Sequence, residues 1–219
     1  MIGETLKEIA PGFMDVIRAR RSIREFLPTP VPEAAIEQLL EAASLAPSSC
    51  NRQPWRFVLV RDRAVLEKMG ASVKARFDEL RSAIPVGELV EEMEMFRVFF
   101  SFFETAPLVV VACYREMPDL LARIVARAGS ATPVDTVSGI HPELQSLSLA
   151  VMSLVLAATN LGLATSVTTG PLIARDAIKE HIGLSRHWEI ATLVPVGYAR
   201  GEPGERPRRK DLTQVATFL

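Results

Sequence analysis

A long run without charged residues limits, more than any other feature, how this chain can fold. From Leu144 to Ala174 the sequence contains no Asp, Glu, Lys or Arg. A helix over residues 144–162 would be apolar on most of its circumference, so it must lie in a large core or be covered by a second copy of the chain. We therefore expect a homodimer built around this helix.

The same run is long enough to cross a bilayer, which makes a membrane span the main alternative. Six polar side chains interrupt it, and it lacks the flanking aromatic residues that mark the ends of membrane-spanning helices. The six are Gln145, Ser146, Ser148, Ser153, Thr159 and Asn160. We expect a buried helix and no membrane partner.

The composition is that of a globular protein with little net charge. Of the 219 residues, 48% are hydrophobic and 23% are charged, which excludes disordered and fibrous classes. The length fits one compact domain over residues 1–219. Because a net charge of -1 gives no long-range attraction to a polyanion, we expect no nucleic-acid partner.

The few cysteines and histidines indicate a reduced protein without a metal centre. Cys50 and Cys113 cannot form a disulfide framework, and the three scattered histidines show no metal-ligand spacing. Residues 1–11 carry charges and lack the apolar core of a signal peptide. We expect a cytoplasmic protein.

Hydrophobic periodicity predicts strands and helices that interleave, in an α+β or α/β plan of three layers. A helix over 63–69 is expected to end at Gly70, and residues 73–104 to form two helical pieces that separate near Pro85 and Gly87. Residues 129–142 read as a loop. The other expected helices cover 13–20, 36–43 and 173–182, and the expected strands cover 55–60, 107–114, 164–169, 189–197 and 212–218.

An arginine-rich element, R-R-S-I-R-E-F over residues 20–26, follows the first expected helix. Three guanidinium groups this close repel one another unless an anion binds between them. A second basic cluster, R-P-R-R-K, occupies residues 206–210. Each cluster fits either a phosphate site or a solvated basic segment.

Two further segments carry polar groups that suit a ligand. The loop A-P-S-S-C-N-R-Q-P-W-R-F, residues 46–57, offers donors and acceptors for the edge of a flat heteroaromatic ring, although ordinary turn chemistry explains them equally well. In V-T-T-G-P-L, residues 167–172, Gly170 permits a close approach of the backbone to a ligand. Signatures of Rossmann, P-loop, serine-hydrolase and zinc-hydrolase sites do not occur in the sequence.

Taken together, these four motifs resemble those of the FMN-dependent nitroreductase family, in order and spacing, over nearly the whole chain. The resemblance implies an α+β fold of three layers (α/β/α), with a central mixed, mostly antiparallel sheet flanked by helices. It also implies a homodimer in which a C-terminal extension crosses to the partner and each FMN lies at the subunit interface.

The resemblance assigns roles to individual residues. Arg20 and Ser22 are expected to hold the flavin phosphate, and Arg24 to lie beside the N1 and O2 edge of the ring. The loop after the second helix would lie over the flavin of the neighbouring subunit. The complete set of expected cofactor contacts is Arg20, Arg21, Ser22, Arg24, Pro47, Ser48, Ser49, Asn51, Gln53, Thr168, Thr169, Gly170, Arg208 and Arg209.

Thr169 and Gly170 are expected beside the ring near N5. Many relatives carry Glu at the position of Thr169. Of the C-terminal pair, Arg209 is the preferred ligand because the following K-D-L resembles the family's ending.

The implied activity is hydride transfer from NADH or NADPH, through flavin N5, to a small acceptor such as a nitroaromatic, a quinone or an enone. This chemistry needs no protein acid or base, so no catalytic residue is expected, and Cys50 is interpreted as structural. Dehalogenation, dehydrogenation, flavin binding without turnover and an anion-binding module are the alternatives. The aromatic stripe of Phe96, Phe99, Phe100 and Phe103 is interpreted as core packing first and as a ligand or dimer wall second.

Overall fold

The structure is a computed structural model, and the residues that it describes are 12–84, 87–117, 124, 127, 141–202 and 204–219. Its sheet has four strands in the order β1-β2-β4-β3, and each neighbouring pair is antiparallel. A single parallel bridge, between Ser22 and Thr165, extends the sheet beyond β3. The sheet is therefore mixed and mostly antiparallel, as expected. The strands are β1 (Trp55–Val60), β2 (Leu108–Tyr114), β3 (Ala164–Thr165) and β4 (Glu189–Gly197).

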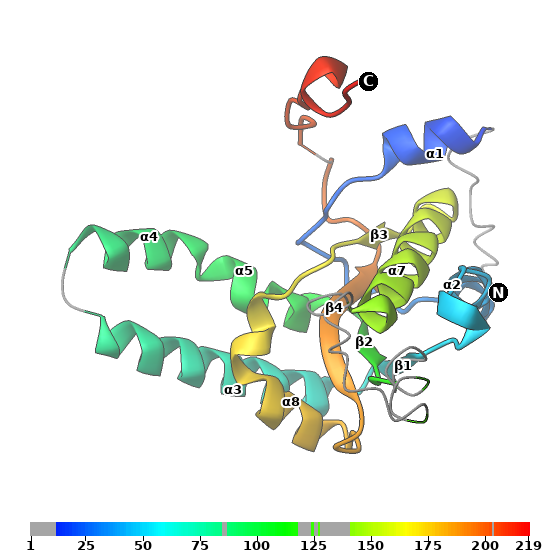
Figure 1. Ribbon diagram of the computed structural model, residues 1–219. Helices are drawn as coiled ribbons and strands as arrows, with labels where there is room; N and C mark the ends of the chain where they lie inside the picture. The colour runs from blue at the N-terminus through cyan, green and yellow to red at the C-terminus, as the bar shows by residue number, and fades with distance from the viewer. Residues whose placement is uncertain (1–11, 85–86, 118–123, 125–126, 128–140, 203) are drawn as a thin grey trace, which may run out of the picture.

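Helices cover both faces of this sheet (Figure 1). Side chains alternate along a strand, so β2 sends Leu108, Val110 and Ala112 into one core and Val109, Val111 and Cys113 into another. The first core is completed by α2 (Glu33–Ser44) and α7 (Pro142–Asn160), and the second by α3 (Arg63–Ala83) and α8 (Arg175–His181). The three-layer α+β plan is confirmed.

The remaining elements are short. They are α1 (Phe13–Ala19), η1 (Ser49–Asn51), α4 (Glu88–Phe96), α5 (Val98–Ser101), η2 (Phe102–Thr105), η4 (Gly170–Ala174) and η5 (Leu212–Gln214), where η denotes a 3-10 helix.

The uncharged helix α7 is buried along one face. Leu147, Ala150, Leu154 and Ala158 on that face are almost fully buried in the first core, whereas Leu149 and Met152 are exposed on the opposite face. Within the described part of the chain, α7 alone is long and apolar enough to cross a membrane, and half of its most apolar window is buried. One chain therefore covers only part of its apolar surface.

The helix that starts at Arg63 does not end at Gly70, which corrects the sequence-based expectation. Asp62 caps α3 by accepting the Ala64 amide at 2.8 Å, and the helix continues to Ala83. Gly70 is buried inside it because the carboxylate of Glu104 occupies the space where a β-carbon would lie. The long α3 pairs with α4 and α5 in an arm that leaves the sheet (Figure 1), and we call these three helices the arm.

Two other predicted boundaries are wrong, and one expected loop is largely untested. Strand β3 ends at Thr165, because the chain then leaves the sheet and only Thr168 pairs again with β4, in an isolated bridge to Leu193. The helix expected from 173 to 182 instead begins as η4, in which Pro171 lacks an amide donor, and continues as α8. Residues 129–140 of the expected loop lie outside the described residues.

The last predicted strand, over 212–218, is wrong: the segment is a 3-10 helix followed by residues that belong to neither a helix nor a strand. A capping box between Asp211 and Gln214 starts η5, and this local hydrogen bonding takes the place of strand pairing. Leu212, Val215 and Phe218 are exposed. The segment is an apolar tail that points away from the sheet (Figure 1).

Candidate functional site

The arginine-rich element lies where α1 ends and the free edge of β3 begins. Arg20 directly follows the last residue of α1, and the Ile23 amide donates to the Thr165 carbonyl at 2.9 Å. Arg20 Nη1 lies 3.4 Å from Ser22 Oγ. The backbone pairing with β3 therefore fixes Arg20 and Ser22, the two expected phosphate ligands, next to each other.

The C-terminal segment returns to this same place. Arg206 Nη2 donates to the carbonyls of Ile17, Arg18 and Arg20 at 2.5–3.3 Å, so Arg206 caps the C-terminal end of α1. Arg209 lies close enough to act on the charge of Arg20, while Arg208 pairs with Asp211 at 4.0 Å on the surface. The geometry thus favours Arg209 over Arg208 as a partner of Arg20. It also adds Arg206, which the R-P-R-R-K motif indicated but the residue-by-residue assignment missed.

Positive charge in this cluster is not neutralised by the protein. Partial burial and, after it, the charges of Arg206, Arg209 and Arg21 lower the pKa of Arg20. Among the described residues, no ion pair joins any of these four arginines to a carboxylate. The C-terminal end of α1 carries a negative partial charge of only about half an elementary charge. This is less than the positive charge of the four guanidinium groups. Such a cluster is suited to an anion with several oxygens.

Arg21 differs from its neighbours because it points back at its own helix. Its Nη1 donates to the carbonyls of Arg18 at 2.7 Å and Arg20 at 3.0 Å. Its Nε is buried without a hydrogen-bond partner among the described residues. Arg21 thus holds the end of α1 and adds positive charge to the cluster, and the orphaned Nε–H leaves one buried donor unused.

The polar loop after α2 is built from left-handed residues that bond to one another. Cys50, Asn51 and Gln53 have φ values of 52°, 53° and 46°, a conformation that costs about 1–3 kcal/mol each in residues other than glycine. Ser48 Oγ accepts the Gln53 amide at 3.0 Å, and Asn51 Oδ1 accepts the Gln53 side chain at 3.2 Å. Hydrogen bonds within the turn therefore use some of the polar groups of the loop. The side chains of Pro47, Ser49, Asn51 and Gln53 remain exposed.

One chain holds this loop away from the arginine cluster. The Ser49 amide donates to Ser146 Oγ at 3.2 Å, near the start of α7, whereas Ser22 pairs with Thr165, beyond its end. From Ser146 to Asn160 the helix rises roughly 20 Å at 1.5 Å per residue. The two motifs thus lie at opposite ends of α7.

The third motif meets the arginine-rich element at Phe99, a residue of the aromatic stripe. The guanidinium carbon of Arg24 lies 4.8 Å from the centre of the Phe99 ring. Thr168 Oγ1 donates to the Phe99 carbonyl at 3.3 Å, and a β-carbon on Gly170 would lie 3.0 Å from that same oxygen. Close packing against α5 therefore explains why position 170 is a glycine. Phe99 contacts both Arg24 and the Thr168–Gly170 segment. Within that segment, Thr169 is exposed.

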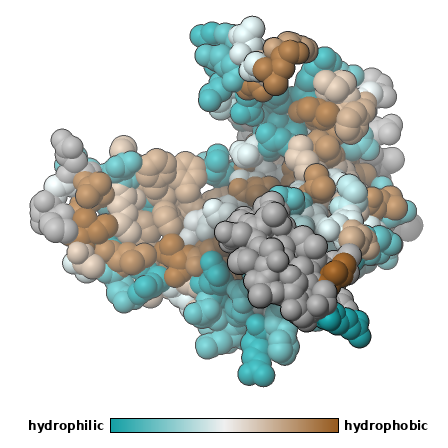
Figure 2. All heavy atoms as spheres, in the orientation of Figure 1, coloured by the Kyte–Doolittle hydropathy of each residue, from teal (hydrophilic) through white to brown (hydrophobic). Residues whose placement is uncertain are grey.

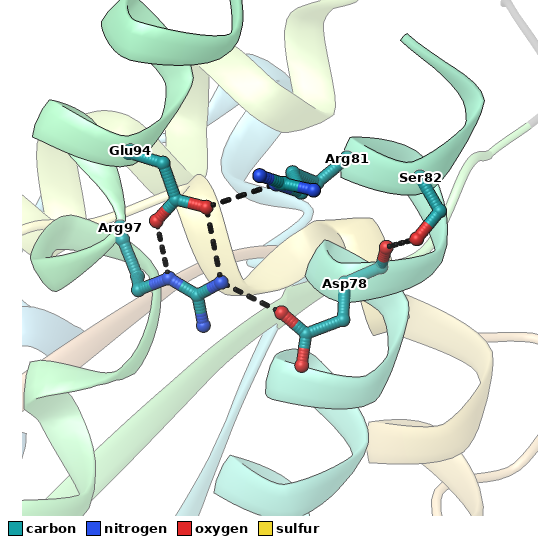
Figure 3. A network of polar contacts seen from close by, with 5 residues as sticks. All are labelled: Asp78, Arg81, Ser82, Glu94 and Arg97. Atoms are coloured by element: carbon teal, nitrogen blue, oxygen red, sulfur yellow. Dashed lines mark hydrogen bonds and ion pairs between the residues drawn. The ribbon is translucent and has the colours of Figure 1, made fainter. Parts of the chain in front are cut away.

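A network of ion pairs fastens the arm (Figure 3). Arg97 bonds to Asp78 of α3 and to Glu94 of α4, both at 2.7 Å, and Arg81 reaches Glu94 at 3.3 Å. The hydrogen bond from Arg97 is the main cause that lowers the pKa of Glu94, and the Glu94 and Asp78 carboxylates in turn raise the pKa of Arg97. Arg97 also lies 4.6 Å above the Phe77 ring. The two sides of the arm are thereby held together.

Neither cysteine belongs to a cluster of metal ligands in the described part of the chain. Within the described ranges, no group of three His, Cys, Asp or Glu side chains is placed to hold a metal ion. Cys50 is exposed in the strained loop, whereas burial raises the pKa of Cys113 to about 12.

The chain is similar to known proteins in both sequence and fold. A family model described as "Nitroreductase family" matches residues 17–198. The chain belongs to the nitroreductase family. The matched region includes Ser22, Arg24, the polar loop and the Thr168–Gly170 segment.

The chain is also similar to individual proteins. An NADH dehydrogenase of Thermus thermophilus is 29% identical over 204 residues, which cover 91% of this chain and 92% of that protein. A BluB-like flavoprotein from Clostridium difficile shares the fold with a TM-score of 0.83 and 22% identity, covering 96% of this chain and 100% of the other. Oxidized iodotyrosine deiodinase bound to FMN and 3-iodo-L-tyrosine has a TM-score of 0.70 at 22% identity, covering 94% and 100%. The nitroreductase-like fold is confirmed, and the family and its names support an oxidoreductase.

Proposed function

We propose that this nitroreductase-family chain binds FMN and transfers hydride from NADH or NADPH to a small organic acceptor, such as a nitroaromatic, a quinone or an enone. The observation that carries the proposal is the unneutralised cluster of Arg20, Arg21, Arg206 and Arg209. A phosphate monoester supplies the negative charge and the oxygens that such a cluster lacks. Bound FMN would supply hydride chemistry at its N5 atom.

The residues of the chain then have separate tasks. Arg20 and Arg209 hold the phosphate, Arg206 keeps the end of α1 in place, and Ser22 offers a hydroxyl between them. Arg24, held on the face of Phe99, places a positive charge beside the ring edge that becomes negative on reduction. The Thr168–Gly170 segment closes the ring side of the site against α5.

We also propose that the site is completed by a second copy of the chain. Because the polar loop and the arginine cluster lie at opposite ends of α7, the loop of one chain can reach the site of another when two α7 helices pack side by side in antiparallel orientation. The exposed Leu149 and Met152 on α7 support such packing, and the exposed apolar tail after Asp211 supports an exchange of C-terminal segments. FMN binding would then favour the dimer by linkage.

Two observations from relatives bear on donor and acceptor. The name of the Thermus thermophilus protein, NADH dehydrogenase, supports NADH as donor. The iodotyrosine deiodinase structure, with 3-iodo-L-tyrosine bound, supports reductive dehalogenation as the second candidate activity. Both activities need the same cofactor site.

The test separates cofactor binding from turnover. Purified protein is titrated with FMN and with riboflavin, which has the same ring without the phosphate. We expect FMN to bind at least tenfold more tightly, because one charged hydrogen bond to phosphate contributes about 1.5–3 kcal/mol. Equal affinities would contradict the phosphate site.

Turnover is then followed anaerobically, by bleaching of the flavin absorbance with NADH or NADPH and its return on adding 4-nitrobenzamide or 3-iodo-L-tyrosine. Reoxidation by the nitro compound supports the proposed activity, and reoxidation by the iodinated compound supports the second candidate. A bound flavin that neither nucleotide bleaches would identify a flavin-binding protein without turnover.

A further inference from the structure

A hollow of about 580 Å³ lies between the arm and the Thr168–Gly170 segment. This volume is within the range of pockets that take small organic ligands. Its walls come from α4, α5, the end of α3 and residues 167–170. The hydropathy surface is brown and tan over much of this arm (Figure 2).

The described walls are mainly apolar and aromatic. Leu89, Met93, Phe96, Phe99 and Phe100 line the hollow, and Glu92 is the charged residue among the lining that the structure describes. Leu89 and Phe96 are 66% and 49% exposed, so large apolar side chains face solvent at the hollow. An aromatic ring that stacks on them would remove this surface from water.

A second hollow in the structure has a lining that is more highly charged than that of the hollow on the arm. It lies between α3 and α8, has a volume of about 660 Å³, and is lined by two basic and two acidic side chains. These are Arg76, Glu79, Arg175 and Asp176. Of these two hollows, the one on the arm combines an aromatic wall with a carboxylate and no basic side chain among its described lining.

The aromatic wall is held in place before any ligand arrives. Phe100 packs edge-on against Phe77, with ring centres 5.0 Å apart, and Arg97 lies over the Phe77 ring while it bonds to Asp78. A wall fixed in this way loses little side-chain freedom on binding. The ion-pair network of the arm therefore supports the shape of the hollow.

Phe99 connects the hollow with the proposed flavin site. It lines the hollow, and it also carries the guanidinium of Arg24 on its ring at 4.8 Å. A ligand in the hollow would thus lie next to the residues assigned to the flavin ring.

We propose that this hollow binds the electron acceptor and selects neutral aromatic acceptors over anionic ones, with Phe96 stacking on the acceptor and Glu92 repelling a negative charge. The inference rests on the proposed function, since it assigns the substrate class of that same site. Among the described residues that line the hollow, none is basic, so the lining itself offers an acidic acceptor no cation beside Glu92.

The test compares two acceptors of the same shape, neutral 4-nitrobenzamide and anionic 4-nitrobenzoate. We expect kcat/KM of the flavin-loaded wild type to favour the amide. Glu92→Gln should raise kcat/KM for the benzoate relative to the amide by about 1.4- to fivefold, since exposed charge pairs contribute about 0.2–1 kcal/mol. High salt should reduce this gain. Glu91→Gln, an exposed neighbour on α4 outside the lining, is the matched control.

Phe96→Ala should lower kcat/KM for the amide about two- to tenfold, because an aromatic contact contributes about 0.5–1.5 kcal/mol, and Phe96→Leu should restore part of it. Equal use of both acceptors by the wild type, or the same change in Glu91→Gln as in Glu92→Gln, would overturn the inference. So would an unchanged amide kcat/KM in Phe96→Ala.

A binding measurement keeps this inference distinct from the proposed function. Benzamide and benzoate cannot accept hydride, and calorimetry with the same variants reports their binding directly. A preference for benzamide that depends on Glu92, in protein that shows no turnover, would support the hollow and refute the activity. Turnover in which neither Glu92 nor Phe96 affects the choice of acceptor would refute the hollow alone.

Discussion

Replacing Arg20 with Ala should have opposite effects on cofactor binding and on the stability of the protein without cofactor. Burial and the charges of Arg206, Arg209 and Arg21 lower the pKa of Arg20, which means that its positive charge is unfavourable when no anion is present. Alanine removes one of the mutually repelling charges. It also removes a phosphate ligand from the proposed site.

The magnitudes follow from the surroundings of the side chain. Loss of one charged hydrogen bond, about 1.5–3 kcal/mol, should weaken FMN binding about 10- to 150-fold. Relief of repulsion is smaller, because Arg20 is only partly buried and solvent screens its neighbours. About 0.5–1 kcal/mol would raise the melting temperature of the FMN-free protein by roughly 1–4 °C for a chain of this length.

Fluorescence titration with FMN and thermal melts with and without FMN measure both effects. Arg18→Ala is the matched control, since it removes a neighbouring arginine that is exposed and already paired with Asp15. In the control, FMN affinity should stay within about twofold. An Arg20→Ala protein that binds FMN as tightly as wild type, or whose FMN-free form melts lower, would refute this account of the cluster.

Three further changes test other parts of the structure. Arg24→Ala should leave most of the FMN bound but lower its midpoint potential, because the cation stabilises the reduced ring; an unchanged potential would remove that role. At mildly alkaline pH one thiol, that of exposed Cys50, should react in the folded protein, since burial raises the pKa of Cys113 to about 12. The same shift should lower the free energy of unfolding as pH rises from 9 towards 12, because the Cys113 thiol loses its proton first in the unfolded state. Rapid reaction of both thiols in the native state would contradict the raised pKa of Cys113. Gly197→Ala should destabilise the protein by about 1–3 kcal/mol in denaturant melts, because a β-carbon would lie 2.7 Å from the Pro107 ring, and wild-type stability would show that the ring can move.

Sequence patterns predicted the elements whose residues specify them locally. Strands β1 and β4 occupy the predicted residues, and β2 differs by one residue, because apolar runs of this length bounded by turn residues fit strands. The buried face of α7 also follows from its composition.

Predicted boundaries were wrong where contacts with residues distant in the sequence determine the structure. Gly70 is a helix-ending signal in sequence, but Glu104 fills the space beside it and α3 continues. The expected strand after Asp211 had suitable apolar residues, but it has no pairing partner in one described chain.

For the candidate site too, the sequence predicted the local motifs but not the contacts that arise from tertiary packing. The arginine-rich element and the C-terminal basic cluster were recognisable as motifs, and the structure brings Arg20, Ser22, Arg206 and Arg209 together. The choice of Arg206 as a helix cap depends on how the tail returns to α1, which spacing does not encode. Phe99 was visible only as one of several phenylalanines, because its contacts with Arg24 and Thr168 arise from tertiary packing.

The return of the C-terminal segment to α1 makes this protein vulnerable to clipping. Arg206 and Arg209 lie on an exposed stretch that a protease can reach before any strand of the sheet opens. A cut just before Arg206 would remove the cap on α1 and a proposed phosphate ligand at once, while both cores stay intact. Preparations with a ragged C-terminus should therefore look folded and colourless, so the mass of the intact chain should be checked before loss of flavin is attributed to any substitution.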